Sequence, residues 1–375
     1  MFLALREMRH SKARYSLIMV IMLLVSFLVL FVTGLARGLA YANISAIENM
    51  PANYFAVQSD AEHTFRRSVL GDPELEAVRA VTGEDNATPL AVQMSTVTAG
   101  SGNADDVKAD ITYFAVDMNG MLAPKVVQGD KLTNDTTGSV LVDKKLEKSG
   151  ITIGSTLRDQ ATGRSFTVAG FVKDSSYSHT PVVYINQQEW QEMKQGASQG
   201  EGSPQAASFN VIALKITGDQ AAELNGKLDH VEIITQKQAI KSIPGYSAEQ
   251  GSLLMMIVFL FVIAAFVLAV FFYVITIQKT SQFGILKAMG TKMSYLAWSV
   301  VGQVMILSIA SLVISLALTF GMNMALPASM PFQLEPMTIL WTSLLFVGMS
   351  LCGSLISVVR VAKVDALEAI GRAYA

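Results

Sequence analysis

Four long apolar runs constrain the fold of this chain more than any other feature of its sequence. They cover about residues 16–35, 252–277, 295–323 and 338–359, and none contains Lys, Arg, Asp or Glu. A helix needs about 20 apolar residues to cross about 30 Å of hydrocarbon, because each residue rises about 1.5 Å. An uncharged segment is also what hydrocarbon demands. We therefore expect four transmembrane helices.

The spacing of the runs predicts one helix, a large inserted domain and then three helices. The expected fold class is membrane α-helical, with a large α+β extracytoplasmic domain between helices 1 and 2. The expected segments are a cytoplasmic amphipathic N-terminal segment (1–15), transmembrane helix 1 (16–40), the extracytoplasmic domain (41–249), transmembrane helix 2 (250–277), a cytoplasmic coupling helix (278–294), transmembrane helix 3 (295–325), an outer loop (326–337), transmembrane helix 4 (338–359) and a cytoplasmic tail (360–375).

Short β-rich runs alternate with helix-like pieces in the inserted domain. The predicted strands are Tyr54–Val57, Gln93–Thr98, Ile111–Val116, Ser139–Val142, Ser165–Val172, Pro181–Ile185, Ser208–Ile216 and Val231–Thr235. The predicted helices are Pro73–Val81 and Asp219–Leu228. The stretch Lys194–Ala207 is rich in Gly, Ser and Gln without apolar periodicity, which predicts a surface loop.

Basic residues predict which ends of the helices face the cytoplasm. Ten lie on three short flanks: Arg6, Arg9, Lys12, Arg14, Lys279, Lys287, Lys292, Arg360, Lys363 and Arg372. The short loop 326–337 has no Lys or Arg. Because basic flanks stay inside, both termini are expected in the cytoplasm and the inserted domain outside. That domain carries 17 Lys and Arg against 26 Asp and Glu, a formal charge of −9, which disfavours a nucleic-acid partner.

The first apolar run has an alternative interpretation as a cleaved signal peptide. It follows basic residues and precedes Ala40-Tyr41-Ala42, which is similar to a signal-peptidase site. The run exceeds the roughly 7 to 15 residues of a signal-peptide apolar region, so we expect a retained helix. The sole cysteine, Cys352, lies inside the fourth run. The exported domain therefore has no disulfide and needs its own apolar core.

The sequence lacks the motifs that nucleotide hydrolysis or hydrolytic chemistry would need. It contains no GxxxxGK[ST] phosphate loop, no HExxH and no GxSxG, and its four histidines are scattered singly, which is typical of surface residues. We expect no enzyme activity, no catalytic residue and no metal site. ATP hydrolysis would belong to a separate partner subunit that binds ATP and Mg²⁺.

The cytoplasmic segment KTSQFGILKAMGTKM, residues 279–293, is too short to form a domain. Its apolar residues Phe283, Ile285, Leu286 and Met289 have helical spacing, and Gly290 predicts a helix stop. One interpretation is an interfacial membrane anchor. The other is a helix that inserts its apolar side chains into a groove of a cytoplasmic partner.

The run QFGILKAMGTK, the one-plus-three arrangement, FLALREMRHSKARYSL at the N-terminus and RVAKVDALEAIGR at the C-terminus resemble the MacB/FtsX-type permeases of ABC transporters. That resemblance implies a homodimer in a bacterial plasma membrane that binds two copies of a cytoplasmic ATPase through the loop after the second helix. It further implies that the ATPase-coupling residues are Phe283, Gly284, Ile285, Leu286, Lys287 and Gly290. Gln282 stands where the family often has an acidic residue.

The pattern GLARGLAYANISAIENM, straight after the first run, is most similar to the HrtB branch of that family, which exports haem. Read from its spacing, the pattern places Arg37, Tyr41, Ile44 and Glu48 on one helix face at the bilayer exit. The guanidinium could pair a haem propionate, and Tyr41 or Glu48 could ligate its iron. The alternative is a plain membrane-exit stalk, with Arg at the headgroups and Tyr in the interfacial belt.

Methionine is abundant, with 19 residues in all, and Met255 and Met256 lie at the outer end of the second apolar run. Flexible thioethers could contact a porphyrin face, and they are also common lipid-facing residues. The leading hypothesis is a permease that takes haem, or a related amphipathic porphyrin, laterally from the membrane and binds no permanent cofactor. The alternatives are FtsX-like mechanotransmission to an extracellular partner, or export of a lipid, lipopeptide or antimicrobial peptide.

Overall fold

The computed structural model describes residues 12–100, 107–197, 208–326 and 330–362. The chain divides into two compact units, which are described separately below. The helical unit combines Met1–Gly38 with Gly251–Ala375, and the inserted domain is Leu39–Gln250. The predicted N-terminal segment up to residue 11 and the tail beyond residue 362 lie outside the described residues.

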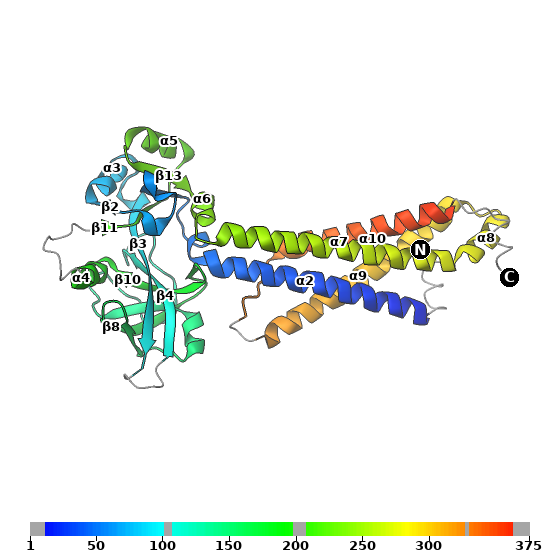
Figure 1. The fold of residues 1–375 in the computed structure, drawn as a ribbon, viewed down its shortest axis with the longest axis horizontal. Helices are drawn as coiled ribbons and strands as arrows, with labels where there is room; N and C mark the ends of the chain where they lie inside the picture. The colour runs from blue at the N-terminus through cyan, green and yellow to red at the C-terminus, as the bar shows by residue number, and fades with distance from the viewer. Residues whose placement is uncertain (1–11, 101–106, 198–207, 327–329, 363–375) are drawn as a thin grey trace. The chain divides into compact units, whose positions relative to one another are not determined.

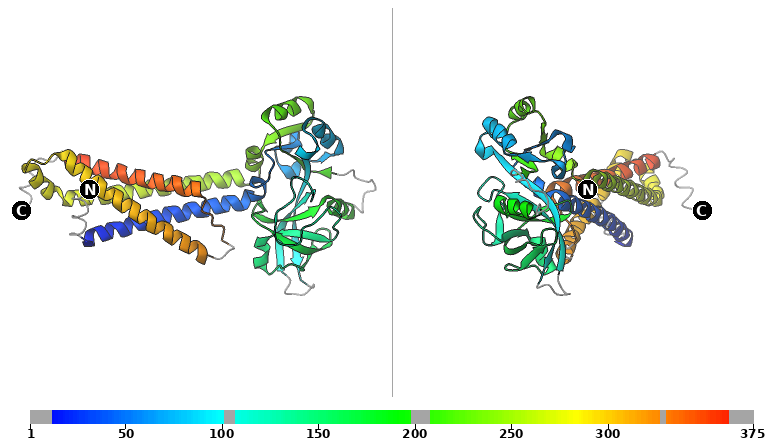
Figure 2. Two further views of the ribbon diagram at one scale, coloured as in Figure 1. Left: turned by 180° about the vertical axis from the view of Figure 1, so that it is seen from behind. Right: turned by 60° about the vertical axis from the view of Figure 1, so that its left-hand side comes forward.

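Four long helices make up most of the helical unit, and α9 crosses the other three obliquely (Figure 1, Figure 2). They are α2 (Lys12–Glu48), α7 (Tyr246–Gln278), α9 (Met293–Ala325) and α10 (Pro336–Ala362), and the short α8 (Thr280–Ala288) follows α7. Within the described residues, these four are the helices long and apolar enough to cross a membrane. The predicted one-plus-three arrangement of apolar helices is confirmed.

Helix α2 continues past residue 40, where the sequence suggested that the first span ends, and stops at Glu48. The amide of Asn49 still donates to the Ser45 carbonyl at 3.0 Å. Pro51 follows two residues later, and a proline disfavours helical geometry in the residue before it. The chain therefore enters the inserted domain as an unbroken helix, with no turn at the end of the apolar run.

Two glycines of α2 allow another segment of the helical unit to lie directly against the helix. A Cβ at Gly38 would lie 2.3 Å from the Pro331 carbonyl oxygen, and one at Gly34 would lie 2.6 Å from the Phe332 ring. The Gln333 amide donates to the Gly34 carbonyl at 3.1 Å. These contacts hold the connection before α10 against α2, at a distance that no larger residue permits.

The inserted domain is built on a large mixed sheet with short helices around it (Figure 1). Its strands are β1 (Tyr54–Gln58), β2 (Leu70–Gly71), β3 (Ala87–Ala99), β4 (Val107–Val116), β5 (Val126–Gly129), β6 (Ser139–Asp143), β7 (Thr156–Asp159), β8 (Ser165–Val172), β9 (Ser176–Tyr177), β10 (Thr180–Asn186), β11 (Ser208–Phe209), β12 (Val211–Leu214) and β13 (Val231–Thr235). Its helices, apart from the ends of α2 and α7, are α3 (Asp72–Thr82), α4 (Gln187–Ala197), α5 (Gly218–Lys227) and α6 (Gln236–Lys241).

The main sheet has the strand order β13-β1-β12-β3-β4-β10-β6-β8-β5 among the described residues. Pairs β4–β10 and β6–β8 are parallel, and the other pairs along this order are antiparallel. Strand β7 pairs with both β3 and β8, so β3, β4, β10, β6, β8 and β7 close into a ring. Closure of this kind removes exposed strand edges.

Side-chain alternation along the strands divides the core of the inserted domain into two apolar clusters. On β4, Tyr113 and Ala115 belong to one cluster, and Phe114 and Val116 belong to the other. This period of two is the ordinary geometry of a strand that is covered on both faces. A β-sheet with apolar clusters on both sides is therefore the scaffold that positions the loops of the domain.

The predicted α+β architecture is confirmed, and each predicted strand and helix has a counterpart in the structure. The elements without a predicted counterpart are β2, β5, β7 and β9, which have two to four residues each, and the helices α4 and α6. The predicted loop Lys194–Ala207 is wrong for its first four residues, because α4 continues through Ala197. The rest of that loop, 198–207, lies outside the described residues.

Candidate functional site

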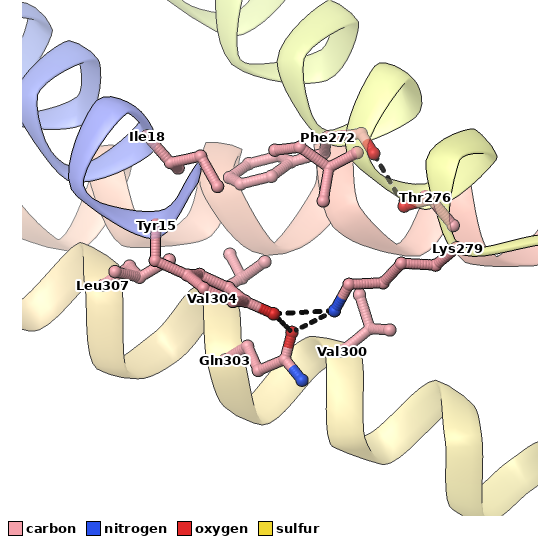
Figure 3. Close-up of a pocket in the computed structure, with 10 residues that line it drawn as sticks. Tyr15, Ile18, Phe272, Thr276, Lys279, Val300, Gln303, Val304 and Leu307 are labelled. Carbon is pink, nitrogen blue, oxygen red and sulfur yellow. Dashed lines mark hydrogen bonds between the residues drawn. The ribbon is translucent and has the colours of Figure 1, made fainter. Parts of the chain in front are cut away.

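Lys279, at the junction of α7 and α8, forms the centre of a buried polar cluster in the helical unit (Figure 3). Its ammonium donates to the Tyr15 hydroxyl at 2.7 Å and to the Gln303 side-chain oxygen at 2.9 Å. Tyr15, on α2, donates to the same Gln303 oxygen on α9 at 2.8 Å. Lys279 is 2% exposed, so three helices converge on one charge that is enclosed by protein.

The cavity beside this cluster is far too small for a transported molecule. Its volume is about 20 Å³, close to what one water molecule occupies, and Phe272, Val304 and Leu307 are among the apolar residues that line it. An ionisable group buried between membrane helices is costly unless it is paired. We therefore interpret the Lys279 cluster as a fixed polar contact that joins the start of α8 to α2 and α9.

Helix α8 begins directly after Lys279 and ends in a Schellman motif. The Gly290 amide donates to the Lys287 carbonyl and the Thr291 amide to the Leu286 carbonyl, both at 3.0 Å. Gly290 has a φ of 89°, a left-handed conformation that favours glycine. The predicted stop at Gly290 is confirmed.

The predicted coupling residues of α8 differ in exposure. Ile285 and Met289 are 52% and 69% exposed, and they lie four residues apart, which places them on one side of the helix. Phe283 and Leu286 are half-buried and Gly284 is buried. The apolar surface that α8 presents is therefore centred on Ile285 and Met289, and contact of these residues with a partner stays a prediction.

The predicted ligand face of α2 is made of residues in different surroundings. The Arg37 Nε lies 3.0 Å from the Glu335 carboxylate, so an acidic group of the helical unit already balances its charge. Ile44 is 2% exposed and packs in an apolar cluster of the inserted domain. Glu48 is partly exposed. Ligand contact by Arg37, Ile44 and Glu48 stays a prediction.

Tyr41 belongs to a hydrogen-bonded set at the end of α2. Its hydroxyl oxygen accepts a hydrogen bond from the Asn49 side-chain amide at 2.9 Å. The same amide donates to the Asp174 carbonyl at 3.0 Å, in the turn between β8 and β9.

Met255 and Met256, on α7, are 58% and 47% exposed, as side chains in contact with lipid or with another molecule would be. Their predicted ligand contact, like that of Tyr41, stays a prediction.

A second polar cluster joins three residues that are far apart in the chain, so no local sequence pattern predicts it. His179, in the turn before β10, lies 2.9 Å from the Glu249 carboxylate on α7. The Asn43 side-chain amide, on α2, donates to Glu249 at 3.0 Å and lies 3.1 Å from the His179 ring. His179 was expected to be an isolated surface residue. It instead ties one turn of the inserted domain to the domain ends of α2 and α7.

The sequence model described as "FtsX-like permease C-terminal" matches residues 254–366. HrtB of Staphylococcus haemolyticus, a permease protein proposed to serve hemin transport, is 31% identical over 373 residues, which is 99% of each chain. The chain belongs to the FtsX-like permease family of ABC transporters. Members of this family are permease subunits and not themselves enzymes, and they generally assemble as dimers with an ATPase partner.

Two further comparisons are more distant. An uncharacterized ABC transporter permease of Mycobacterium tuberculosis is 22% identical over 377 residues, again 99% of each chain. The solved extracellular domain of the transporter YknZ from Gram-positive bacteria aligns with 49% of this chain and 99% of its own length. Its sequence identity is 18% and its TM-score is 0.34.

Proposed function

We propose that this chain is the permease subunit of an ATP-driven efflux pump that exports haem, or a related amphipathic porphyrin. The observation that carries the proposal is the 31% identity to a permease proposed for hemin transport, over 99% of both chains. Similarity over the full length supports it because the membrane helices, the inserted domain and the α8 segment are all included. Haem would be the transported ligand, and ATP with Mg²⁺ would bind the partner ATPase.

Lateral uptake from the membrane suits a helical unit that has so few ionisable groups between its helices. A porphyrin that enters from the lipid needs no polar pore through the helices. Motion of the ATPase would reach the helices through α8, whose first residues are fixed to α2 and α9 by the Lys279 cluster. Rigid-body movement of one subunit against the other would then release the ligand outward.

The proposed orientation places both termini and α8 in the cytoplasm and the inserted domain outside, because basic flanks remain inside. The test uses two conservative cysteines in a Cys352→Ala background, since Cys352 is exposed and free. Ser149→Cys, on an exposed turn of the inserted domain, should react with an impermeant thiol reagent on intact cells. Ala288→Cys, exposed on α8, should react only after lysis. The reverse labelling pattern would overturn the orientation and the exporter with it.

The proposed docking of α8 to the ATPase rests on its exposed apolar pair, Ile285 and Met289. Ile285→Asp would place an unpaired charge in an apolar groove of the partner, so co-purification of the ATPase should fall sharply while the permease still reaches the membrane. Gln282→Glu is the matched control, because it adds a charge to α8 at an exposed position where the family often has an acid. Equal retention of the ATPase by both variants would favour the membrane-anchor interpretation.

The haem proposal predicts a shifted Soret band when haemin is added to the purified permease. Arg37→Ala should weaken binding by roughly 10-fold to 150-fold if the guanidinium pairs a propionate, since a charged hydrogen bond contributes about 1.5–3 kcal/mol. Glu335→Gln is the control, because it removes the carboxylate that Arg37 contacts and keeps the guanidinium. Binding should then hold or tighten. Parallel losses in both variants would make Arg37–Glu335 a structural ion pair.

The same purified system separates haem export from its alternatives. Haemin should stimulate the partner's ATPase, and cells that express both subunits should survive added haemin. If haemin neither binds nor protects, and an extracellular protein co-purifies instead, mechanotransmission replaces export as the function. Stimulation of the ATPase by a lipid or a lipopeptide, with no response to haemin, would identify a different cargo.

A further inference from the structure

A hollow of about 430 Å³ opens in the inserted domain beside Tyr41. Its volume lies within the about 300–1,000 Å³ of small-molecule sites. The side chains that define its chemistry are Tyr41, Met50, Met121, Lys125, Lys173 and Asp174. They come from the end of α2, the segment before β5 and the turn after β8, so the fold brings together three regions that are distant in sequence.

The walls of the hollow are fixed by hydrogen bonds. Asn49 joins the Tyr41 hydroxyl to the Asp174 carbonyl, so the end of α2 and the β8–β9 turn hold one another. Behind the turn, Ser175 lies 2.6 Å from the Tyr184 hydroxyl, and its amide donates to the Asp143 carboxylate at 2.6 Å. A hollow whose walls are cross-linked in this way is preformed, which lowers the entropic cost of binding.

The charges around the hollow favour an anionic ligand. Lys125 and Lys173 line it together with one acid, Asp174, whereas the domain as a whole is strongly acidic. The Lys173 ammonium lies 3.7 Å from the Asp174 carboxylate, and both groups are well exposed. An exposed pair of this kind contributes little, so a ligand carboxylate can compete for the lysine.

The remaining groups favour a flat apolar ring that carries a metal. The thioethers of Met50 and Met121 adapt to an apolar face. Two tyrosines also line the hollow, but burial raises the pKa of Tyr184 to about 12, which keeps that phenol neutral. The Tyr41 oxygen accepts a hydrogen bond, and such a donor stabilises the negative charge that a tyrosinate carries when it ligates ferric iron.

We propose that this hollow binds an iron porphyrin through the two carboxylates and the ferric iron of the ligand, with Tyr41 on the iron and with Lys125 and Lys173, in place of Arg37, on the carboxylates. The inference rests on the proposed haem export and assigns the ligand to specific residues of the inserted domain. On binding, the Tyr41 oxygen replaces a water on the ferric iron and its proton passes to bulk water. No electron is transferred.

The test titrates haemin into the full-length permease in detergent. The double variant Lys125→Gln, Lys173→Gln should weaken binding about 100-fold to 10,000-fold, since two charge-assisted contacts are lost. Lys215→Gln with Lys237→Gln is the matched control, because these exposed lysines of the same domain lie outside the hollow. Asp174→Asn should tighten binding, because it removes the competing carboxylate. Asn also tolerates the φ of 55° at this position.

Two further measurements separate the roles of the iron and the carboxylates. Tyr41→Phe should change the Soret spectrum of bound haemin, and it should leave the binding of metal-free protoporphyrin nearly unchanged. Protoporphyrin dimethyl ester, which has no free carboxylate, should bind the double lysine variant and the parent equally. Spectral identity of Tyr41→Phe and the parent, or equal weakening by the two lysine pairs, would overturn the assignment.

The outcome for the hollow can be told apart from the outcome for export. If the parent exports haem and the hollow variants bind haemin and protect cells as well as the parent, the assignment of the haem site to the hollow is wrong, and the proposed export function stands. If the parent itself neither binds haemin nor protects cells, the proposed function fails together with the assignment. Thermal unfolding transitions that match the parent show that the variants fold.

Discussion

The helical unit and the inserted domain place large apolar side chains in opposite ways. Phe266 on α7 and Trp298 on α9 are 69% and 74% exposed, whereas Phe114 and Phe166 in the inserted domain are at most 1% exposed. Water favours the burial of such surface by about 25 cal/mol per Å², but lipid chains are as apolar as the side chains themselves. Exposure of an apolar side chain is therefore unfavourable in the inserted domain and nearly neutral on the membrane helices.

The two units also differ in how their buried polar groups find hydrogen-bond partners. Several buried hydroxyls of the membrane helices donate to a carbonyl of their own helix, as Thr319 does to Ser315 at 2.7 Å. In the inserted domain, the buried carboxylate of Glu189 is paired with Arg164, which reaches solvent. A helix in hydrocarbon satisfies its polar groups locally because no water can do so. The Lys279 cluster differs, because its hydrogen bonds join side chains from three helices.

The largest expected contrast comes from two phenylalanine truncations. Phe114→Ala should destabilise the inserted domain by about 3–5 kcal/mol, because it leaves a cavity in a packed core. That loss corresponds to a fall in the thermal midpoint of about 6–20 °C for a domain of this size. Phe266→Ala, on the exposed face of α7, should leave the midpoint of the purified protein within a few degrees of the parent. Similar shifts in both variants would mean that a partner surface covers α7.

A charge introduced at an exposed position should have a larger effect in the helical unit than in the inserted domain, which is the reverse of the order expected for the truncations. Phe266→Asp should disfavour membrane insertion by about 2.5–3.5 kcal/mol, the cost of an aspartate near the centre of a spanning helix. Val127→Asp, at a 52% exposed position of β5, should change stability by less than about 0.5 kcal/mol. The measurement is the yield of each variant in the membrane fraction. Parental yield of Phe266→Asp would show that this face of α7 does not meet lipid.

The smallest expected effect on stability comes from the Lys279 cluster, where loss of the buried ammonium is compared with loss of one of its hydrogen-bond partners. Gln303→Leu removes an oxygen acceptor from the Lys279 ammonium and should cost about 1–3 kcal/mol. Lys279→Met removes the charge itself and leaves the Tyr15–Gln303 hydrogen bond, so its cost should be smaller. Thermal unfolding in detergent ranks the two variants. A larger loss in Lys279→Met would mean that the ammonium itself is a net source of stability.

Local patterns were sufficient to predict most of the secondary structure. Uncharged runs of 20 or more residues identify membrane helices because the thickness of hydrocarbon sets the length of the run. The β-rich run Ile111–Val116 revealed β4, and Gly290 revealed the end of α8, because both depend on neighbouring residues only. The shortest strands, such as β9 with two residues, were missed because two residues carry no period.

The sequence by itself determined the membrane class, the one-plus-three arrangement of helices and the main strands of the inserted domain. The surroundings of single residues were decided only by the tertiary structure. Lys279 follows an apolar run as any basic flank residue would, and the Tyr15 and Gln303 oxygens, which accept hydrogen bonds from its ammonium, lie 264 and 24 residues away in the chain. The hollow beside Tyr41 likewise depends on Lys125 and Lys173, which no local pattern connects to α2. The composition of each segment determines whether it is stable in lipid or in water, whereas the partner of a polar group depends on which distant segments the fold brings together.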